Sequence, residues 1–222
     1  MNWMALELSL KLAAWTTLIL LPVGIMAGRV LAWRHFKAKP VVEALLMLPL
    51  VLPPTVLGFY MLVALGGESV IGQFYQALSG RTLVFSFEGL VIASIIFNLP
   101  FAIQPLQRAF EGIPVEVREA AACCGHKPWR TFWRIELPLA WPGILTSLVL
   151  TFAHTIGEFG IVLMVGGNIP GETQTIAIAI YDQVQAFDNA SAGLMSAVLL
   201  LVSLAAISLT YFSTSFIGRR HD

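Results

Sequence analysis

Five polar residues with helical spacing stand out in an otherwise apolar stretch of the chain. They are Ser147, Thr151, His154, Thr155 and Glu158. At intervals of three to four residues these side chains fall on one face of a helix. In a membrane-spanning helix, ionisable groups normally face a bundle interior or a wet cavity, so Thr151, His154, Thr155 and Glu158 of this stripe are candidates for a translocation path. The alternative is structural: the hydroxyls bond to their own i−4 carbonyls and hold helices together.

Further candidates for the path lie where helices are expected to break. The segment LPLVLPPTVLGFY at 48–60 contains three prolines, and broken helices often lie beside transport paths. Thr55 follows the double proline and is a candidate gate residue, with a simple kink as the alternative. In another apolar stretch Ser94 and Asn98 lie one helical turn apart, which adds Asn98 to the candidate path.

The common motifs of catalysis and nucleotide binding are missing from the sequence. It has no GxxxxGK[ST] loop, GxSxG elbow or HExxH helix, so an energy source would have to be a partner protein. An intramembrane enzyme would depend on His154 and Glu158 alone. Cys123 and Cys124 are adjacent, whereas closed zinc sites need four ligands with spaced cysteine pairs. We therefore expect no metal site and no cofactor bound by this chain.

The elements that must position these residues are membrane-spanning helices. Only 12% of the 222 residues are charged and 57% are hydrophobic, whereas an ordinary soluble domain has about a quarter charged residues. A bilayer core needs about 20 apolar residues per helix, and five stretches approach this length. We expect an all-α integral membrane protein that forms a single transmembrane domain over residues 1–222. The expected spans are 8–30, 42–66, 87–106, 139–165 and 190–216.

The distribution of lysine and arginine predicts the orientation. Most cations lie in three segments, which follow the first, third and fifth spans: Arg29, Arg34, Lys37 and Lys39; Arg108, Arg118, Lys127, Arg130 and Arg134; and Arg219 and Arg220. With five crossings these segments share one side, which the positive-inside rule makes cytoplasmic. The N-terminus is expected outside and the C-terminus inside the cell (inner) membrane, with the spans in contact with lipid. Thirteen acidic residues balance thirteen basic ones, so no nucleic-acid partner is expected.

The cytoplasmic loop at 108–138 carries the most specific pattern. Residues 113–138 predict two short helices, with Pro114 at the first helical position, Gly125 ending the first helix in a left-handed conformation and Pro128 beginning the second. In the second helix, basic residues and the aromatic residues Trp129, Phe132 and Trp133 fall on opposite faces. We therefore expect it to lie flat with its aromatic side chains toward the bilayer. An interfacial loop without further function is the alternative.

Seven fixed positions over twenty residues distinguish this loop. They are Glu119, Ala120, Ala121, Gly125, Ile135, Leu137 and Pro138. The pattern EAA-x3-G-x9-I-x-L-P resembles the EAA motif of the membrane subunits of binding-protein-dependent ABC importers. The resemblance implies that the first helix is a coupling helix, which seats in a groove of a cytoplasmic ATPase. Its small residues would allow close approach, Glu119 would provide a charged anchor, and the last three positions would fix the loop to the fourth span.

The segment at 166–185 joins the fourth and fifth spans on the opposite side of the membrane. Turn signals at Gly166, Gly167, Pro170 and Gly171 precede a possible short amphipathic helix from Thr175 on. Its position suits contact with an extracytoplasmic binding protein, and a solvated hairpin is the alternative. The expected docking residues are Asn168, Ile169, Pro170, Gly171, Glu172 and Thr173.

Four segments together resemble the molybdate/tungstate branch of these permeases, over nearly the whole chain. They are LPLVLPPTVLGFY at 48–60, the EAA loop, GEFG at 157–160 and GNIPGETQT at 167–175. The resemblance implies the MetI-like importer permease fold and a homodimer. It also implies two copies of a separate ABC ATPase, which would carry ATP and Mg²⁺, and an extracytoplasmic oxyanion-binding protein.

The implied function is import of a tetrahedral oxyanion, molybdate or tungstate, by alternating access. A sulfate/thiosulfate importer is the nearest alternative, because the sulfate permeases share the EAA loop and a similar GEFG region. An ungated anion channel and an intramembrane enzyme are more distant alternatives. One departure from the pattern concerns His154, where relatives often have arginine. A histidine carries a pH-dependent charge, so an anion-attracting role is in doubt at this position.

Overall fold

The structure, a computed structural model, describes residues 2–218, and the side-chain surroundings up to residue 208. Residues 2–218 are mostly helical and contain no β-strand, which confirms the all-α fold class. The helices are α1 (Trp3–Trp33), α2 (Lys39–Val51), α3 (Pro54–Leu65), α4 (Val70–Ser79), α5 (Phe87–Glu111), α6 (Val115–Cys123), α7 (Pro128–Thr131), the π-helix η1 (Phe132–Glu136), α8 (Leu137–Leu139), α9 (Trp141–Gly157), α10 (Gly160–Gly166), α11 (Ile176–Gln185) and α12 (Asn189–Gly218).

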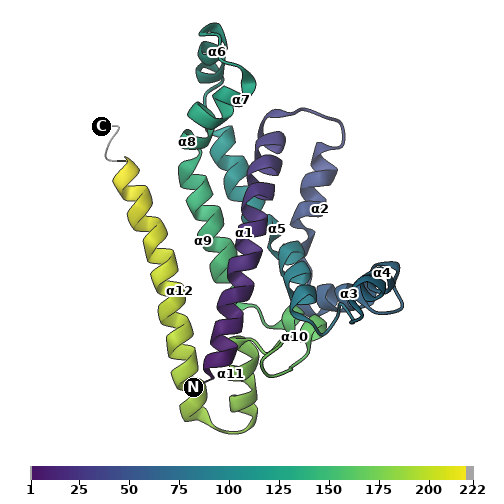
Figure 1. Cartoon of the computed structure of the whole chain (residues 1–222). Coiled ribbons are helices and arrows are strands. Elements are labelled where there is room, and N and C mark those ends of the chain that lie inside the picture. The colour runs from purple at the N-terminus through teal and green to yellow at the C-terminus, as the bar shows by residue number, and fades with distance from the viewer. Residues whose placement is uncertain (1, 219–222) are drawn as a thin grey trace.

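The helices α1, α2, α5, α9 and α12 run roughly along one direction (Figure 1). Among the described residues α1, α5 and α12 are long and apolar enough to cross a membrane. Two bent pairs, α2 with α3 and α7–α8 with α9, raise this number to five if each pair forms one span. The structure therefore accommodates the five expected crossings.

A close contact between α1 and α5 forms the centre of the bundle. A Cβ atom at Gly24 would lie 2.9 Å from the Ala102 carbonyl oxygen, and one at Gly28 would lie 2.9 Å from the Gln107 nitrogen. Small residues one turn apart allow helix backbones to approach in this way. The helix α9 joins the same group, because the Ser147 hydroxyl donates a 2.9 Å hydrogen bond to the Ala102 carbonyl.

Two of the expected spans are broken. The chain bends by 109° between α2 and α3, where Pro53 takes an extended conformation ahead of Pro54, because a proline disfavours the α conformation in the residue before it. The range 42–66 therefore turns near residue 53. The range 139–165 divides at Glu158 into α9 and α10. The two breaks meet, since a Cβ at Gly160 would lie 2.8 Å from the Pro54 Cβ.

The bundle has two different ends (Figure 1). The helices α6 and α7 lie at one end with the C-terminal end of α1 and the start of α2, while α4, α10, α11 and the start of α1 lie at the other. Two of the three basic segments that the sequence assigns to one side therefore meet at the same end. The third, Arg219 and Arg220, lies outside the described residues. We call the first end the α6 end and the second the α11 end.

Candidate functional site

The helix α6 begins and ends close to where the sequence predicts the first helix of this loop. It ends before Gly125, which has a φ of +76°, and the backbone N–H of His126 donates to the Ala121 carbonyl at 3.0 Å. This is the left-handed helix end that the sequence predicted. Pro114 is the residue that precedes the helix, one position earlier than expected, and Pro128 begins α7 as predicted.

The motif residues of α6 lie on two different faces. Glu119 and Ala120 are exposed, together with Gly125. Ala121 is buried, and Arg118 beside the motif is partly buried. The face that is open to a partner therefore contains Glu119 and Ala120, whereas Ala121 faces the body of the molecule. Cys123 and Cys124 are exposed free thiols, and the described part of the chain contains no group of three or more His, Cys, Asp or Glu residues that could hold a metal.

The second half of the loop departs from the expected flat amphipathic helix. After the single turn of α7 the chain forms the π-helix η1, whose wider turn shifts the side chains away from an α-helical wheel. Phe132 is consequently buried against Phe110 and Ile113 rather than facing a bilayer, while Trp129 and Trp133 are exposed. The prediction that all three aromatic side chains share a lipid-facing surface is therefore wrong for Phe132.

The three remaining motif positions have different surroundings. Leu137 packs against the cluster that contains Phe110, Ile113 and Phe132, so it connects the loop to α5. Ile135 is partly buried and Pro138 is exposed. Of these three positions, Leu137 has the contact expected of a residue that fixes the loop to the bundle.

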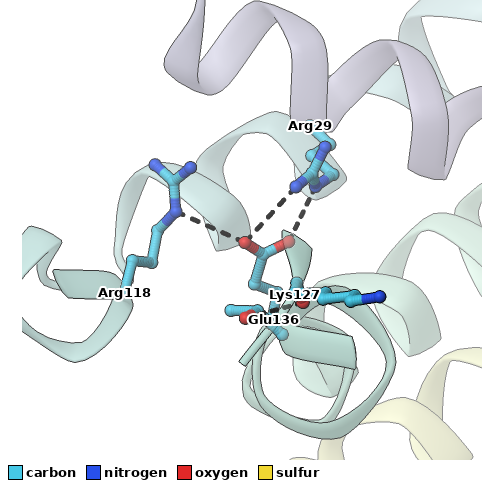
Figure 2. Close-up of polar contacts among 5 residues, drawn as sticks. Arg29, Arg118, Lys127 and Glu136 are labelled. Atoms are coloured by element: carbon cyan, nitrogen blue, oxygen red, sulfur yellow. Dashed lines mark hydrogen bonds and ion pairs between the residues drawn. The ribbon is translucent and has the colours of Figure 1, made fainter. Parts of the chain in front are cut away.

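The sequence analysis missed a buried carboxylate in the middle of this loop. Glu136 occupies the unspecified position between Ile135 and Leu137, and its side chain is 1% exposed. Figure 2 shows Arg29 and Arg118 directed at this carboxylate. The Arg29 Nε lies 2.7 Å from Glu136 Oε2, and the Arg118 Nε lies 3.3 Å from Oε1. The sequence carries no signal for this site, because Glu136 is one of several charged residues in the loop and its partner Arg29 lies far away in the sequence.

Two of the three hydroxyl groups of the polar stripe on α9, those of Ser147 and Thr155, make structural contacts. The Ser147 hydroxyl bonds to α5, as described above, and the Thr155 hydroxyl donates to the Thr151 carbonyl at 2.7 Å. Both threonines are buried, and the Thr151 hydroxyl has no hydrogen-bond partner among the described residues. For Thr155 the geometry matches the structural alternative of an i−4 bond.

His154 and Glu158 do not form a pair. No hydrogen bond joins them within residues 2–218, and the His154 ring instead lies against Phe97 and Phe101 of α5, with centroid distances of 4.9 and 4.1 Å. The Glu158 carboxylate accepts a 3.0 Å hydrogen bond from the backbone N–H of Ile161. It therefore caps the start of α10. His154 and Glu158 thus have separate neighbours and do not form a shared catalytic site.

The other two path candidates lie apart from each other. Thr55 is exposed in the first turn of α3. Asn98 is fully buried in α5, where its amide donates to the Ser94 carbonyl at 2.8 Å and its carbonyl oxygen has no partner among the residues described. The predicted path residues thus lie on α3, α5 and α9 and in the turn between α9 and α10.

The loop at the α11 end is held by side-chain hydrogen bonds and presents most of the expected docking residues. Asn168 donates to both carboxylate oxygens of Asp182 at 3.0 and 2.8 Å, and Gln174 donates to the Asn168 carbonyl at 2.9 Å. Thr173 is fully buried, and its hydroxyl accepts from the Ile169 backbone. The expected docking surface is therefore smaller by one residue, because Thr173 holds the loop from inside.

A large cleft adjoins this loop. Its volume is about 830 Å³ and it lies between the start of α1, the segment after α4 and the loop that contains Gly171 and Glu172. Charged side chains of both signs line it: Glu7, Lys11, Arg81, Glu88 and Glu172. The α11 end thus offers a hollowed, mixed-charge surface beside the docking residues.

Comparisons with known proteins agree with these features. A family model described as "Binding-protein-dependent transport system inner membrane component" matches residues 21–221. A molybdenum transport system permease protein of Azotobacter vinelandii is 47% identical over 212 residues, which cover 96% of this chain and 94% of that protein.

Solved structures show the same fold. A bacterial alginate ABC transporter, in complex with an alginate pentasaccharide-bound periplasmic protein, matches with a TM-score of 0.77 and 17% identity, over 96% of this chain and 78% of that chain. The MetNI methionine ABC transporter, in an inward-facing conformation, matches with a TM-score of 0.64 and 19% identity. The match covers 99% of this chain and 93% of that chain. The expected MetI-like permease fold is thereby confirmed. The chain belongs to the family of binding-protein-dependent transport system inner membrane components.

Proposed function

We propose that this chain is the membrane-spanning subunit of an ATP-driven importer that moves molybdate, and also tungstate, into the cytoplasm. The observation that carries the proposal is the 47% identity to a molybdenum transport permease over nearly the full length of both chains. Membership of the family makes the chain a multi-pass inner membrane component and a transport subunit rather than an enzyme. ATP and Mg²⁺ would bind to the separate ATPase.

The two ends of the bundle suit two different partners. At the α6 end the exposed Glu119 and Ala120 would contact a cytoplasmic ATPase subunit, and the small side chain at Ala120 would allow close approach. At the α11 end the loop with Asn168, Ile169, Pro170, Gly171 and Glu172 would contact the oxyanion-binding protein. Under this proposal the N-terminus would lie outside and the C-terminus inside, as the positive-inside rule predicts.

A second copy of the chain is needed for the path. A bare dianion in hydrocarbon would cost tens of kcal/mol on an idealised estimate, so the ion requires a water-lined cavity, and the path candidates lie on several helices of one copy without lining its large cleft. We propose that two copies enclose this cavity, that lipid surrounds them, and that two ATPase subunits contact them at the α6 end. When the two ATPase subunits close around bound ATP, they would move the α6 helices and open the cavity to the outside. Hydrolysis of the ATP would return the subunits to their starting arrangement.

The path residues divide into two groups under this proposal. Thr55 is exposed on α3 and would face the cavity between the copies. His154 and Thr151 carry polar atoms without partners among the described residues, and a rearrangement of α5 against α9 would bring these atoms to the ion. The unpartnered atom of Asn98 is its carbonyl oxygen, which accepts hydrogen bonds and would therefore face water in the path rather than the oxyanion. Thr155 and Glu158 have structural bonds, so they would hold the helices beside the path.

Uptake measurements on the reconstituted complex test the proposal. Vesicles that contain this chain, its ATPase and its binding protein are loaded with ATP, and entry of labelled molybdate is followed with excess tungstate or sulfate outside. We expect tungstate to block uptake and sulfate to leave it unchanged. Equal competition by sulfate would assign the chain to sulfate import, and uptake that needs no ATP would identify a channel.

A further inference from the structure

We propose that Glu136, with Arg29 and Arg118, is the positioning group that makes α6 move as one body with α1 and the start of α9. The inference rests on the proposed function, since it concerns how motion at the ATPase contact reaches the membrane helices. None of the three residues belongs to the seven fixed positions of the loop motif. Their role follows from the contacts around one carboxylate.

The carboxylate joins three segments that are far apart in the sequence. Glu136 ends η1 and leads through α8 into α9, Arg29 lies near the C-terminal end of α1, and Arg118 lies in α6. Arg29 contacts both oxygens, with Nε 2.7 Å from Oε2 and an Nη atom 3.4 Å from Oε1, while the Arg118 Nε lies 3.3 Å from Oε1. One buried side chain therefore holds the ends of all three segments at one point (Figure 2).

Aromatic rings fix the two guanidinium groups in place. The Arg118 guanidinium lies 3.8 Å from the centroid of the Trp33 ring, and that of Arg29 lies 5.1 Å from the same ring. Trp33 in turn contacts Phe110 of α5 edge to face, at 5.3 Å. Cations over aromatic faces are attracted to them, so this arrangement extends the connection from α6 to α5.

The helix α6 has two other inward-facing side chains that attach it. It has nine residues; Ala121 is its one buried residue, and the half-buried Val117 packs against the cluster of Phe110, Ile113 and Phe132. A helix this short is not stable alone in water, so tertiary contacts must hold it. Arg118 and Ala121, three positions apart, share the inward face, and the exposed Glu119 and Ala120 lie beside them. The ion contact of Arg118 is thus placed directly behind the surface that would meet the ATPase.

Burial makes the contact resistant to separation. A carboxylate that is 1% exposed has lost its water, so without Arg118 its Oε1 would keep only the 3.4 Å contact with an Arg29 Nη atom. The side chain of Lys127, although close in Figure 2, points away from the carboxylate. The loop therefore does not offer a replacement cation from this position, and a displacement of α6 is passed to α1 and α9 rather than absorbed in the loop.

The test compares three substitutions in the vesicle complex, with the ratio of molybdate imported to ATP hydrolysed as the readout. Arg118→Gln removes the ion contact, Arg118→Lys keeps the charge, and Arg108→Gln is the control, since Arg108 forms an exposed pair with Glu111. We expect Arg118→Gln to lower the ratio severalfold while the ATPase still co-purifies and hydrolyses ATP. Arg118→Lys should recover most of the ratio and Arg108→Gln should match wild type.

Several outcomes would overturn the inference. A ratio for Arg118→Gln equal to that of Arg108→Gln would show that the contact does not transmit motion, and loss of ATPase co-purification would show that it only builds α6. Glu136→Asp provides a second variant that keeps the charge but shortens the side chain, and a wild-type ratio there would also contradict the inference. Absence of ATP-driven uptake in the wild-type complex would instead refute the proposed function.

Discussion

Gly143→Ala is expected to loosen the contact between α9 and α5 just after the loop at 108–138. A Cβ atom at this position would lie 2.3 Å from the Ala109 Cβ and 2.8 Å from the Pro105 carbonyl oxygen. Neither atom is the far end of a flexible side chain, so the helices themselves must move apart. Ala109 also packs against the cluster of Phe110, Ile113 and Phe132, so the displacement would reach the loop.

The size of the effect follows from two opposing terms. Overpacking in a close contact typically costs about 1–3 kcal/mol, and the upper value applies here because both neighbours are fixed. Alanine in place of a glycine within a helix stabilises the helix by about 1 kcal/mol. We therefore expect Gly143→Ala to lower the free energy of unfolding by about 2 kcal/mol, the difference between these terms.

Unfolding of the detergent-solubilised chain by increasing fractions of SDS, followed by tryptophan fluorescence, measures this change. Gly193→Ala is the matched control, since a Cβ there would meet no atom within 4 Å. It should stabilise the chain by up to about 1 kcal/mol through helix propensity alone. The double substitution Gly143→Ala with Ala109→Gly should recover part of the loss. If Gly143→Ala were as stable as wild type, the close contact of α5 and α9 would be refuted.

Substitutions at three further positions test other parts of the account. Glu158→Ala should destabilise the chain by about 1 kcal/mol through loss of the cap on α10, whereas Glu158→Gln keeps an acceptor and should cost less in the same SDS titration. Thr155→Val should leave the initial molybdate uptake rate unchanged, because its hydroxyl bonds to the Thr151 carbonyl, and a large loss would place this hydroxyl in the path. Asn168→Ala removes the bonds to Asp182; it should reduce stimulation of ATP hydrolysis by the binding protein without changing the basal rate, and unchanged stimulation would contradict the docking surface.

The parts of the fold that local sequence determines were predictable. Gly125 ends α6 with a positive φ, and Pro128 begins α7, because glycine and proline restrict the backbone directly at these positions. The double proline likewise marked the break between α2 and α3. The angle of that break, 109°, depends on the packing of α3 against α10 and has no signal in the sequence.

The parts that depend on long-range contacts were not predictable. The buried ion contact of Glu136 has no signal in the loop sequence, because its partners Arg29 and Arg118 come from other elements. Phe132 was placed on a lipid-facing surface because an α-helical wheel does not represent the π-helix that forms there. Thr173 was assigned to a docking surface because a turn sequence does not reveal which side chains point inward. In each case tertiary packing decides where the side chain lies.

The most direct test of the central claim, that the exposed face of α6 couples ATP hydrolysis to oxyanion import, is molybdate uptake by Glu119→Lys in ATP-loaded vesicles. Glu119 is exposed, so the chain should fold and insert normally, while reversal of the charge should disrupt the contact with the ATPase. Glu68→Lys makes the same charge change at an exposed position outside the motif. We predict that Glu119→Lys abolishes ATP-dependent uptake and Glu68→Lys retains it. Undiminished ATP-dependent uptake by Glu119→Lys would contradict the account.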